Sequence, residues 1–135
     1  MVTSIGKTNK RKGFDAERLY ANRFREMGFS NCLTTRESSR LLDRCKVDLN
    51  FLPFMIQIKA GIQRNLNFSK TLLEMDENLL QHFPITHEYF SFPHIVIHHK
   101  QGRKGVNRTE YDELVIMSFN TFKKLINEYK NNPNI

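Results

Sequence analysis

The sequence predicts a single α/β domain in which helices flank a mixed central sheet. Its 135 residues can form one hydrophobic core but are too few for two. A hydrophobic share of 39%, with eleven Phe, indicates a folded chain. Segments in which apolar residues have helical spacing alternate with apolar segments of strand length, and this order is typical of α/β domains.

The first helix is predicted over residues 14–27, where apolar residues recur with helical spacing. Gly28 follows it, and glycine is the preferred residue directly after a helix. The preceding residues, 1–12, contain the basic run Lys7 to Lys12. We expect them to form an arm that stays flexible until it binds a partner.

Three strands are expected next. Residues 31–35 form the first, and a polar connection over residues 36–40 follows it. Residues 47–52 and 54–60 form the other two, as a hairpin that reverses at Pro53.

A symmetrical reversal in this hairpin places Asp48 opposite Gln57. Because side chains alternate between the two faces of a strand, Asp48, Gln57 and Lys59 then share one face. The opposite face receives apolar side chains: Val47, Leu49, Phe51, Ile56 and Ile58. A carboxylate, an amide and an ammonium between hydrophobic strands are costly unless they act together, so this group is the main candidate site.

The C-terminal half is predicted to contain, in order, a helix over 67–82, strands over 94–99 and 111–117, and a helix from the Ser118 cap to about Lys130. The basic, glycine-containing residues 100–108 connect the two strands. The tail, residues 131–135, is expected to fray.

The net charge of +7 is concentrated at the start of the chain. Residues 1–46 hold eleven Lys and Arg against five Asp and Glu. This excess favours a polyanionic partner, and nucleic acid more than a membrane because no amphipathic anchor accompanies it; a generally basic solvated surface is the alternative. We expect a cytoplasmic protein, since no apolar run could cross a bilayer and no signal peptide precedes the domain; Cys32 and Cys45 are interpreted as reduced thiols.

Glu17 lies in the middle of the apolar side of the first predicted helix, so its carboxylate should face the core. There it either pairs with a buried cation or reaches the same site as Asp48. Together with Asp48 and the amide oxygen of Gln57, it would supply hard oxygen ligands suited to Mg²⁺ or Mn²⁺.

Lys59 is two residues beyond Gln57 on the same strand face. An ammonium beside such a metal site can stabilise the attacking hydroxide and the developing charge on a phosphoryl group. The group therefore predicts metal-assisted phosphodiester hydrolysis. Nucleotide hydrolysis at a glycine-rich phosphate loop is not indicated, because the sequence has no such motif.

An early helix bearing Glu, then Asp, a hairpin and Gln-x-Lys resembles the PD-(D/E)XK nuclease superfamily. The opening Lys12-Gly-Phe-Asp-Ala-Glu-Arg18, Met27-Gly-Phe29 and the Arg36 to Ser39 connection most resemble its Holliday junction resolvase-like members from archaea and phages. The motifs cover roughly residues 10 to 60, and beyond them only the order of elements agrees. The resemblance implies a restriction-endonuclease-like core and, for a phage protein, the cytoplasm of the host.

By position, Glu17, Asp48 and Gln57 correspond to the metal ligands of this family and Lys59 to its catalytic lysine. Ser38 or Ser39 corresponds to a serine near the scissile phosphate of the resolvases, and we assign Ser39 to the catalytic set. Two residues depart from the family pattern. Gln57 replaces the usual Glu, and Val47 stands where Pro is common.

The resemblance implies a magnesium-dependent endonuclease that acts as a homodimer on branched DNA. A nuclease of another type (restriction, nicking or repair) and a non-catalytic DNA-binding module of the same fold stay open as alternatives. The residues expected to contact DNA are Lys7, Lys10, Arg11, Lys12, Arg36, Ser38, Arg40, Arg103, Lys104 and Arg108. His94, His98 and His99 fit no common zinc-site spacing.

Overall fold

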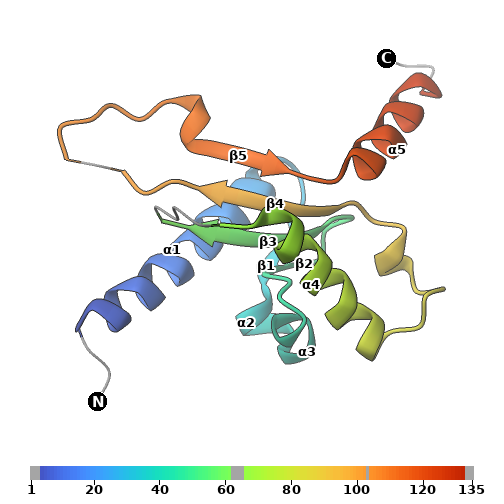
Figure 1. Ribbon diagram of the computed structural model, residues 1–135, viewed down its shortest axis with the longest axis horizontal. Helices are drawn as coiled ribbons and strands as arrows, with labels where there is room; N and C mark the ends of the chain where they lie inside the picture. The colour runs from blue at the N-terminus through green and yellow to red at the C-terminus, as the bar shows by residue number, and fades with distance from the viewer. Residues whose placement is uncertain (1–3, 62–65, 103, 133–135) are drawn as a thin grey trace.

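The structure is a computed structural model that describes residues 4–61, 66–102 and 104–132, with side chains from residue 11 onward. Its centre is a three-stranded sheet in the order β3 (Met55–Ala60), β4 (His94–His99) and β5 (Glu113–Ile116). β3 and β4 are parallel, whereas β4 and β5 are antiparallel. The predicted α/β class with a mixed central sheet is therefore confirmed (Figure 1).

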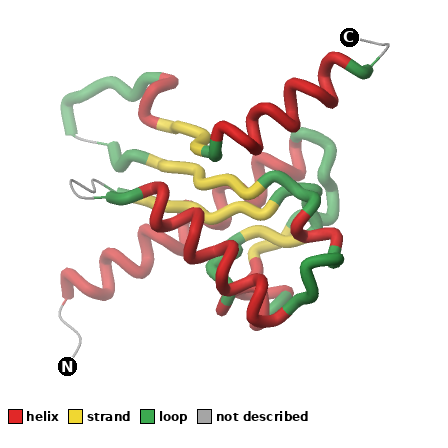
Figure 2. The backbone as a smooth tube through the Cα atoms, turned by 45° about the vertical axis from the view of Figure 1, so that its right-hand side comes forward, coloured by secondary structure: helices red, strands yellow, loops and turns green. Residues whose placement is uncertain are grey.

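Helices cover the two faces of this sheet (Figures 1 and 2). α1 (Ser4–Glu26) packs Tyr20 and Ala21 against the isoleucines of β3 and β4. α4 (Phe68–His82) packs Met75 and Leu79 on the opposite side. These two layers form the two hydrophobic clusters of the domain.

α1 begins ten residues before the predicted start at Phe14. Residues 4–12, expected to form a separate arm, have helical backbone that continues into the rest of α1. Lys and Arg are good helix formers, so their charge gives no reason for the helix to start later. The predicted end is confirmed: Gly28 has φ 111°, and Phe29 N–H donates to Phe24 C=O at 3.0 Å, which closes a Schellman motif.

The segment after α1 differs most from the prediction. The first strand is only β1 (Leu33–Thr34), and the expected polar connection is helical, as α2 (Thr35–Ser38) and α3 (Arg40–Arg44). The sequence carries a sign of this: Thr34 and Glu37 have the spacing of a capping box, and the structure forms one.

The predicted hairpin is correct in its reversal but wrong in its pairing. β2 (Leu49–Asn50) forms its ladder with β1, and a single backbone hydrogen bond from Asp48 N–H to Ile56 C=O links this segment to β3. Phe51, expected in the core, is exposed and has φ 64°. The turn breaks the alternation there, because a residue in the left-handed region no longer continues a strand.

The C-terminal elements follow the prediction closely. Asn67 caps α4, β4 has the predicted bounds, and Ser118 caps α5 (Phe119–Lys130) by accepting from Thr121 N–H at 3.1 Å. The strand expected over 111–117 is shorter, because Glu110–Asp112 forms a 3-10 turn before β5. In the described part of the chain, no helix is both long and apolar enough to cross a membrane.

Candidate functional site

A cleft of about 560 Å³ lies at the outer edge of β3, the edge strand on one side of the sheet. α1 forms one wall, and the segment that leads into β2 forms another. The cleft brings together all four residues of the predicted metal and lysine site, Glu17, Asp48, Gln57 and Lys59. The other residues that line it are Gly13, Phe14, Arg36, Asp43, Lys46, Ile58 and Ala60.

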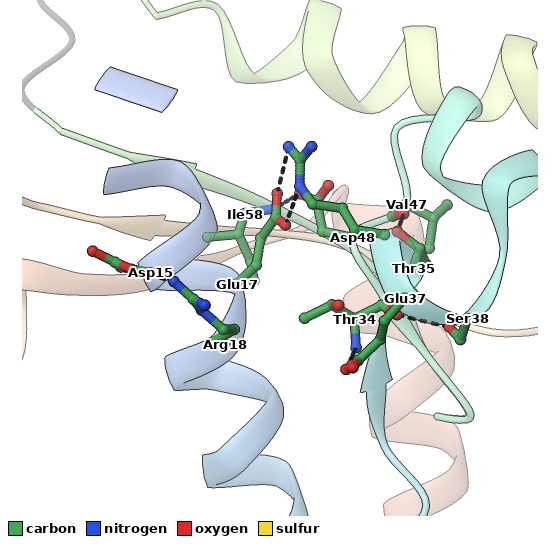
Figure 3. Close-up of polar contacts among 11 residues, drawn as sticks. Asp15, Glu17, Arg18, Thr34, Thr35, Glu37, Ser38, Val47, Asp48 and Ile58 are labelled. Atoms are coloured by element: carbon green, nitrogen blue, oxygen red, sulfur yellow. Dashed lines mark hydrogen bonds and ion pairs between the residues drawn. The ribbon is translucent and has the colours of Figure 1, made fainter. Parts of the chain in front are cut away.

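Glu17 is buried and forms an ion pair across the mouth of the cleft. Its carboxylate accepts from Arg36 Nε at 2.7 Å and from Arg36 Nη2 at 3.3 Å (Figure 3). The guanidinium also lies over the Phe14 ring, 3.8 Å from its centroid. The side chain of Glu17 is 7% exposed and that of Arg36 is 44% exposed, so the cation lies on the solvent side of the pair. Glu17 thus pairs with a cation that is half-exposed rather than buried, and it also lines the same cleft as Asp48.

Asp48 is held against β3 by its backbone and by its side chain. Its N–H donates to Ile56 C=O at 2.8 Å. Its Oδ2 accepts from Ile58 N–H at 2.7 Å (Figure 3). Burial, followed by the charge of Glu17, raises the pKa of the Asp48 carboxyl to about 7. Two carboxylates thus face one small polar space, and a cation placed between them would relieve their repulsion.

Gln57 and Lys59 project from β3 on the face opposite to Ile56 and Ile58, as predicted from strand alternation. Gln57 is buried, and Lys59 is half-buried. Among the residues that the structure describes, neither side chain has a hydrogen-bond or ion-pair partner. Both are therefore free to turn toward a ligand in the cleft.

The donors in the cleft suit a hard divalent cation. Asp48 and Gln57 supply a carboxylate and an amide oxygen, and Glu17 supplies a second carboxylate once Arg36 has left it. No group of three or more His, Cys, Asp or Glu side chains arranged for a metal occurs within the described ranges, so a metal bound in the cleft would need an amide or water oxygen among its ligands. Magnesium accepts such incomplete protein coordination, because it commonly retains several waters.

Asp43 and Lys46 line the cleft but were not among the predicted site residues. Asp43 lies on α3, and its charge further raises the pKa of Asp48. Lys46 has φ 69°, so the backbone turns sharply before Val47 and directs the next residue, Asp48, into the cleft. Recognising α3 from the apolar pair Leu41-Leu42 would have drawn attention to the turn that follows it.

The two predicted serines do not line the cleft. Ser39 caps α3 by accepting from Leu42 N–H at 3.2 Å. Ser38 Oγ donates to Thr34 C=O at 2.7 Å (Figure 3). It also accepts from Asn50 Nδ2 at 3.1 Å. Their hydroxyls stabilise the α2–α3 corner that carries Arg36 to the site.

The predicted DNA contacts are only partly described. Arg11, Lys12, Arg40, Lys104 and Arg108 are exposed, whereas Arg103 and the side chains of Lys7 and Lys10 lie outside the described residues. Both views place the N-terminal half of α1 and the loop after β4 on the side of the molecule where β3 ends (Figures 1 and 2).

The three histidines of β4 do not converge. His94 contacts Asp76 at 3.4 Å, the His98 ring packs against Phe68, and His99 Nδ1 is 2.9 Å from the hydroxyl of Tyr20. Cys32 and Cys45 are free and fully buried, and burial raises the pKa of both thiols. Neither the histidines of β4 nor the two cysteines form a second candidate site.

Comparisons of this chain with protein-family models, with curated proteins and with solved structures find no match.

Proposed function

We propose that this protein is a metal-dependent endodeoxyribonuclease that hydrolyses phosphodiesters in branched DNA, with a restriction-endonuclease-like core. One observation carries the proposal: Glu17, Asp48, Gln57 and Lys59, which are up to 42 positions apart in the sequence, line one cleft. Carboxylates, an amide and a free ammonium in one cleft match the chemistry of metal-assisted phosphoryl transfer.

In this proposal Asp48 and Gln57 hold Mg²⁺ or Mn²⁺, and Glu17 joins them. The metal, when bound, polarises the phosphoryl oxygen and lowers the pKa of a bound water. Arg36 controls whether Glu17 is available to the metal. Its guanidinium donates two hydrogen bonds to Glu17 and can donate the same pair to a phosphate. A DNA phosphate that binds Arg36 would therefore release the Glu17 carboxylate.

Lys59 acts on the reacting phosphate. Its ammonium projects into the cleft without a described partner. An unpaired cation at this position stabilises the negative charge that grows on the phosphoryl oxygens in the transition state. Being half-buried, it acts in a medium less screened than bulk water.

We further propose that exposed basic residues of α1 and of the loop after β4 track the DNA backbone on both sides of the cleft. The chain carries a net charge of +7, and such a charge steers a polyanion toward the protein. The resemblance to junction resolvases adds a homodimer and a cytoplasmic location, the host cytoplasm for a phage protein.

The purified full chain, incubated with Mg²⁺ or Mn²⁺ and with four-way, forked, linear duplex and single-stranded DNA, tests this proposal. We expect cleavage of branched substrates that stops when EDTA is added. Asp48→Asn should remove the activity, whereas Glu77→Gln, an exposed carboxylate change on α4, should keep it. Equal cleavage of linear duplex would indicate a nuclease of another type.

A non-catalytic DNA-binding module is the second candidate, and the Glu17–Arg36 pair favours it. While Arg36 is paired with Glu17, its guanidinium occupies the carboxylate that a metal ion would otherwise bind. If this pair persists in the complex with DNA, the protein binds branched DNA in the presence of Mg²⁺ or Mn²⁺ but does not cleave it. Binding without cleavage in the assay above would select this candidate.

A further inference from the structure

The apolar stripe of α5 is turned away from the rest of the protein. Phe119, Phe122, Ile126 and Tyr129 recur with helical spacing, and all four are exposed, Phe119 to 79%. The opposite side of the helix, with Thr121, Lys124, Leu125 and Glu128, faces α4 across a cavity of about 380 Å³. An amphipathic helix normally buries its apolar stripe, so this orientation indicates a missing partner.

The strand that leads into α5 is also open. β5 is the last strand of its sheet, and no described strand pairs with its outer edge. Leu114 and Val115 are exposed on it. Edge strands are usually protected by lysine, proline or a bulge, and the four residues of β5 contain no lysine or proline.

The exposed apolar surface is large enough for a stable interface. Tyr111, just before β5, is exposed as well, and with the aromatic residues of α5 it offers roughly 500 Å² of aromatic surface. The aliphatic side chains of both elements and the backbone edge of β5 add to this. The total approaches the ~800 Å² that each partner buries in a standard interface.

We propose that two copies of this chain associate through this surface, which consists of Tyr111, Leu114, Val115, Phe119, Phe122, Ile126 and Tyr129. A strand edge is self-complementary, because a two-fold axis pairs it antiparallel with its own copy. If the axis passes between Leu114 and Val115, the partner subunit's Tyr111 lies opposite Ser118, beside the start of α5. The same contact then satisfies the open edge and covers the apolar stripe.

The chemistry of the surface selects a second copy over a polyanion. None of its seven residues is charged, and it lies on the opposite side of the molecule from the basic N-terminal half of α1 (Figures 1 and 2). β4, by contrast, is central in the sheet, and its residues Ile95, Val96 and Ile97 are buried.

Pairing through β5 leaves both clefts accessible. The joined sheet has six strands, and β3 forms its two outer edges. The six strands have five spacings of ~4.8 Å between them, so the two β3 edges would be about 24 Å apart. This separation is shorter than one turn of DNA, about 34 Å, so one DNA substrate could span both clefts. The association does not depend on the proposed nuclease activity, although it would present two clefts to one substrate.

Light scattering coupled to gel filtration of the full chain, at ~10 to 100 µM and without DNA, tests the association. We expect a dimer of 16.0 kDa subunits for the unmodified chain. Val115→Lys should give a monomer, because a lysine on the edge strand blocks pairing. Val106→Lys is the matched control, since Val106 is 64% exposed and Val115 is 61% exposed, and it should stay dimeric.

The double substitution Phe122→Ser and Ile126→Ser tests the helix stripe separately. It should weaken dimerisation at least tenfold while the circular dichroism spectrum stays that of the unmodified chain. A monomeric unmodified chain at 100 µM would overturn the proposal. So would a dimer that persists in both Val115→Lys and the double variant.

Discussion

The two edges of the central sheet are opposite in character. At the β3 edge, polar groups are buried: Glu17, Asp48 and Gln57 have little contact with water. At the β5 edge, apolar groups are exposed on both the strand and α5. Each arrangement lowers the stability of the isolated chain, one through desolvated charge and the other through unburied apolar area.

This difference shows what each edge is suited to bind. A buried carboxylate whose pKa is raised to about 7 gains from a cation, and an apolar edge gains from another apolar surface. The proposals made above accordingly place metal-dependent chemistry at the β3 edge and self-association at the β5 edge.

Removal of the charges at the polar edge should have the largest effect. Asp48→Asn and Lys59→Ala should each reduce the rate of metal-dependent cleavage a hundredfold or more, because the first weakens the metal site and the second removes transition-state stabilisation. Initial rates on four-way DNA, together with binding measured in Ca²⁺ or EDTA, separate chemistry from affinity.

Lys130→Ala, at the exposed end of α5, is the control for Lys59→Ala and should cleave at the unmodified rate. If Lys59→Ala also cleaves at that rate, the lysine has no part in the reaction, and the functional contrast between the edges is lost.

The pKa of Asp48 predicts how stability depends on pH in metal-free protein. The carboxyl titrates near pH 4 when unfolded and near pH 7 when folded, so the native state holds its proton longer. The contribution of the Asp48 carboxyl to the free energy of unfolding is therefore largest below pH 4, and it decreases as the pH rises from 4 to 7. Burial, then the charges of Glu17 and Asp43, raise this pKa, while the hydrogen bond from Ile58 and the charge of Arg36 lower it.

Asp48→Asn should therefore raise the melting temperature at pH 8 in EDTA by several degrees and reduce the loss between pH 5 and pH 8. Thermal denaturation at both pH values measures this. Equal melting temperatures of the two proteins at pH 8 would show that the Asp48 carboxylate is not destabilising in the fold.

The Glu17–Arg36 pair should contribute a smaller amount of stability. Arg36→Ala leaves a buried carboxylate without its cation and should lower the free energy of unfolding by about 1–2 kcal/mol, less than for a fully buried pair because solvent reaches Arg36. Mg²⁺ should restore part of the loss.

Arg18→Ala removes an exposed pair with Asp15 and should change stability by less than about 0.5 kcal/mol. Urea denaturation with and without Mg²⁺ compares the variants, and a loss for Arg36→Ala no larger than for Arg18→Ala would contradict the role of the pair.

Gln57→Glu should have the smallest effect on activity. A third carboxylate strengthens the metal site, so the Mg²⁺ concentration at half-maximal rate should fall a few-fold while cleavage persists. In EDTA the same change adds repulsion and should lower the melting temperature. An inactive variant with a native circular dichroism spectrum would exclude Gln57 as a ligand.

Much of the local structure follows from sequence alone. The end of α1 at Gly28, the Asn67 cap of α4, the bounds of β4 and the Ser118 cap of α5 are decided by residues next to each other in the chain. Strand alternation likewise places Gln57 and Lys59 on one face. Such features depend on side-chain chemistry and backbone geometry over a few residues, which a sequence displays directly.

Long-range contacts decided the rest. No local pattern shows that Arg36 would reach back to Glu17, that β2 would pair with β1, or that Asp43 and Lys46 would border the cleft. The helical stripe of α5 is evident in the sequence, but only the packed structure shows that it faces outward. Propensity and periodicity determine which elements form, whereas the burial of surfaces distant in sequence determines how they meet and what they leave exposed.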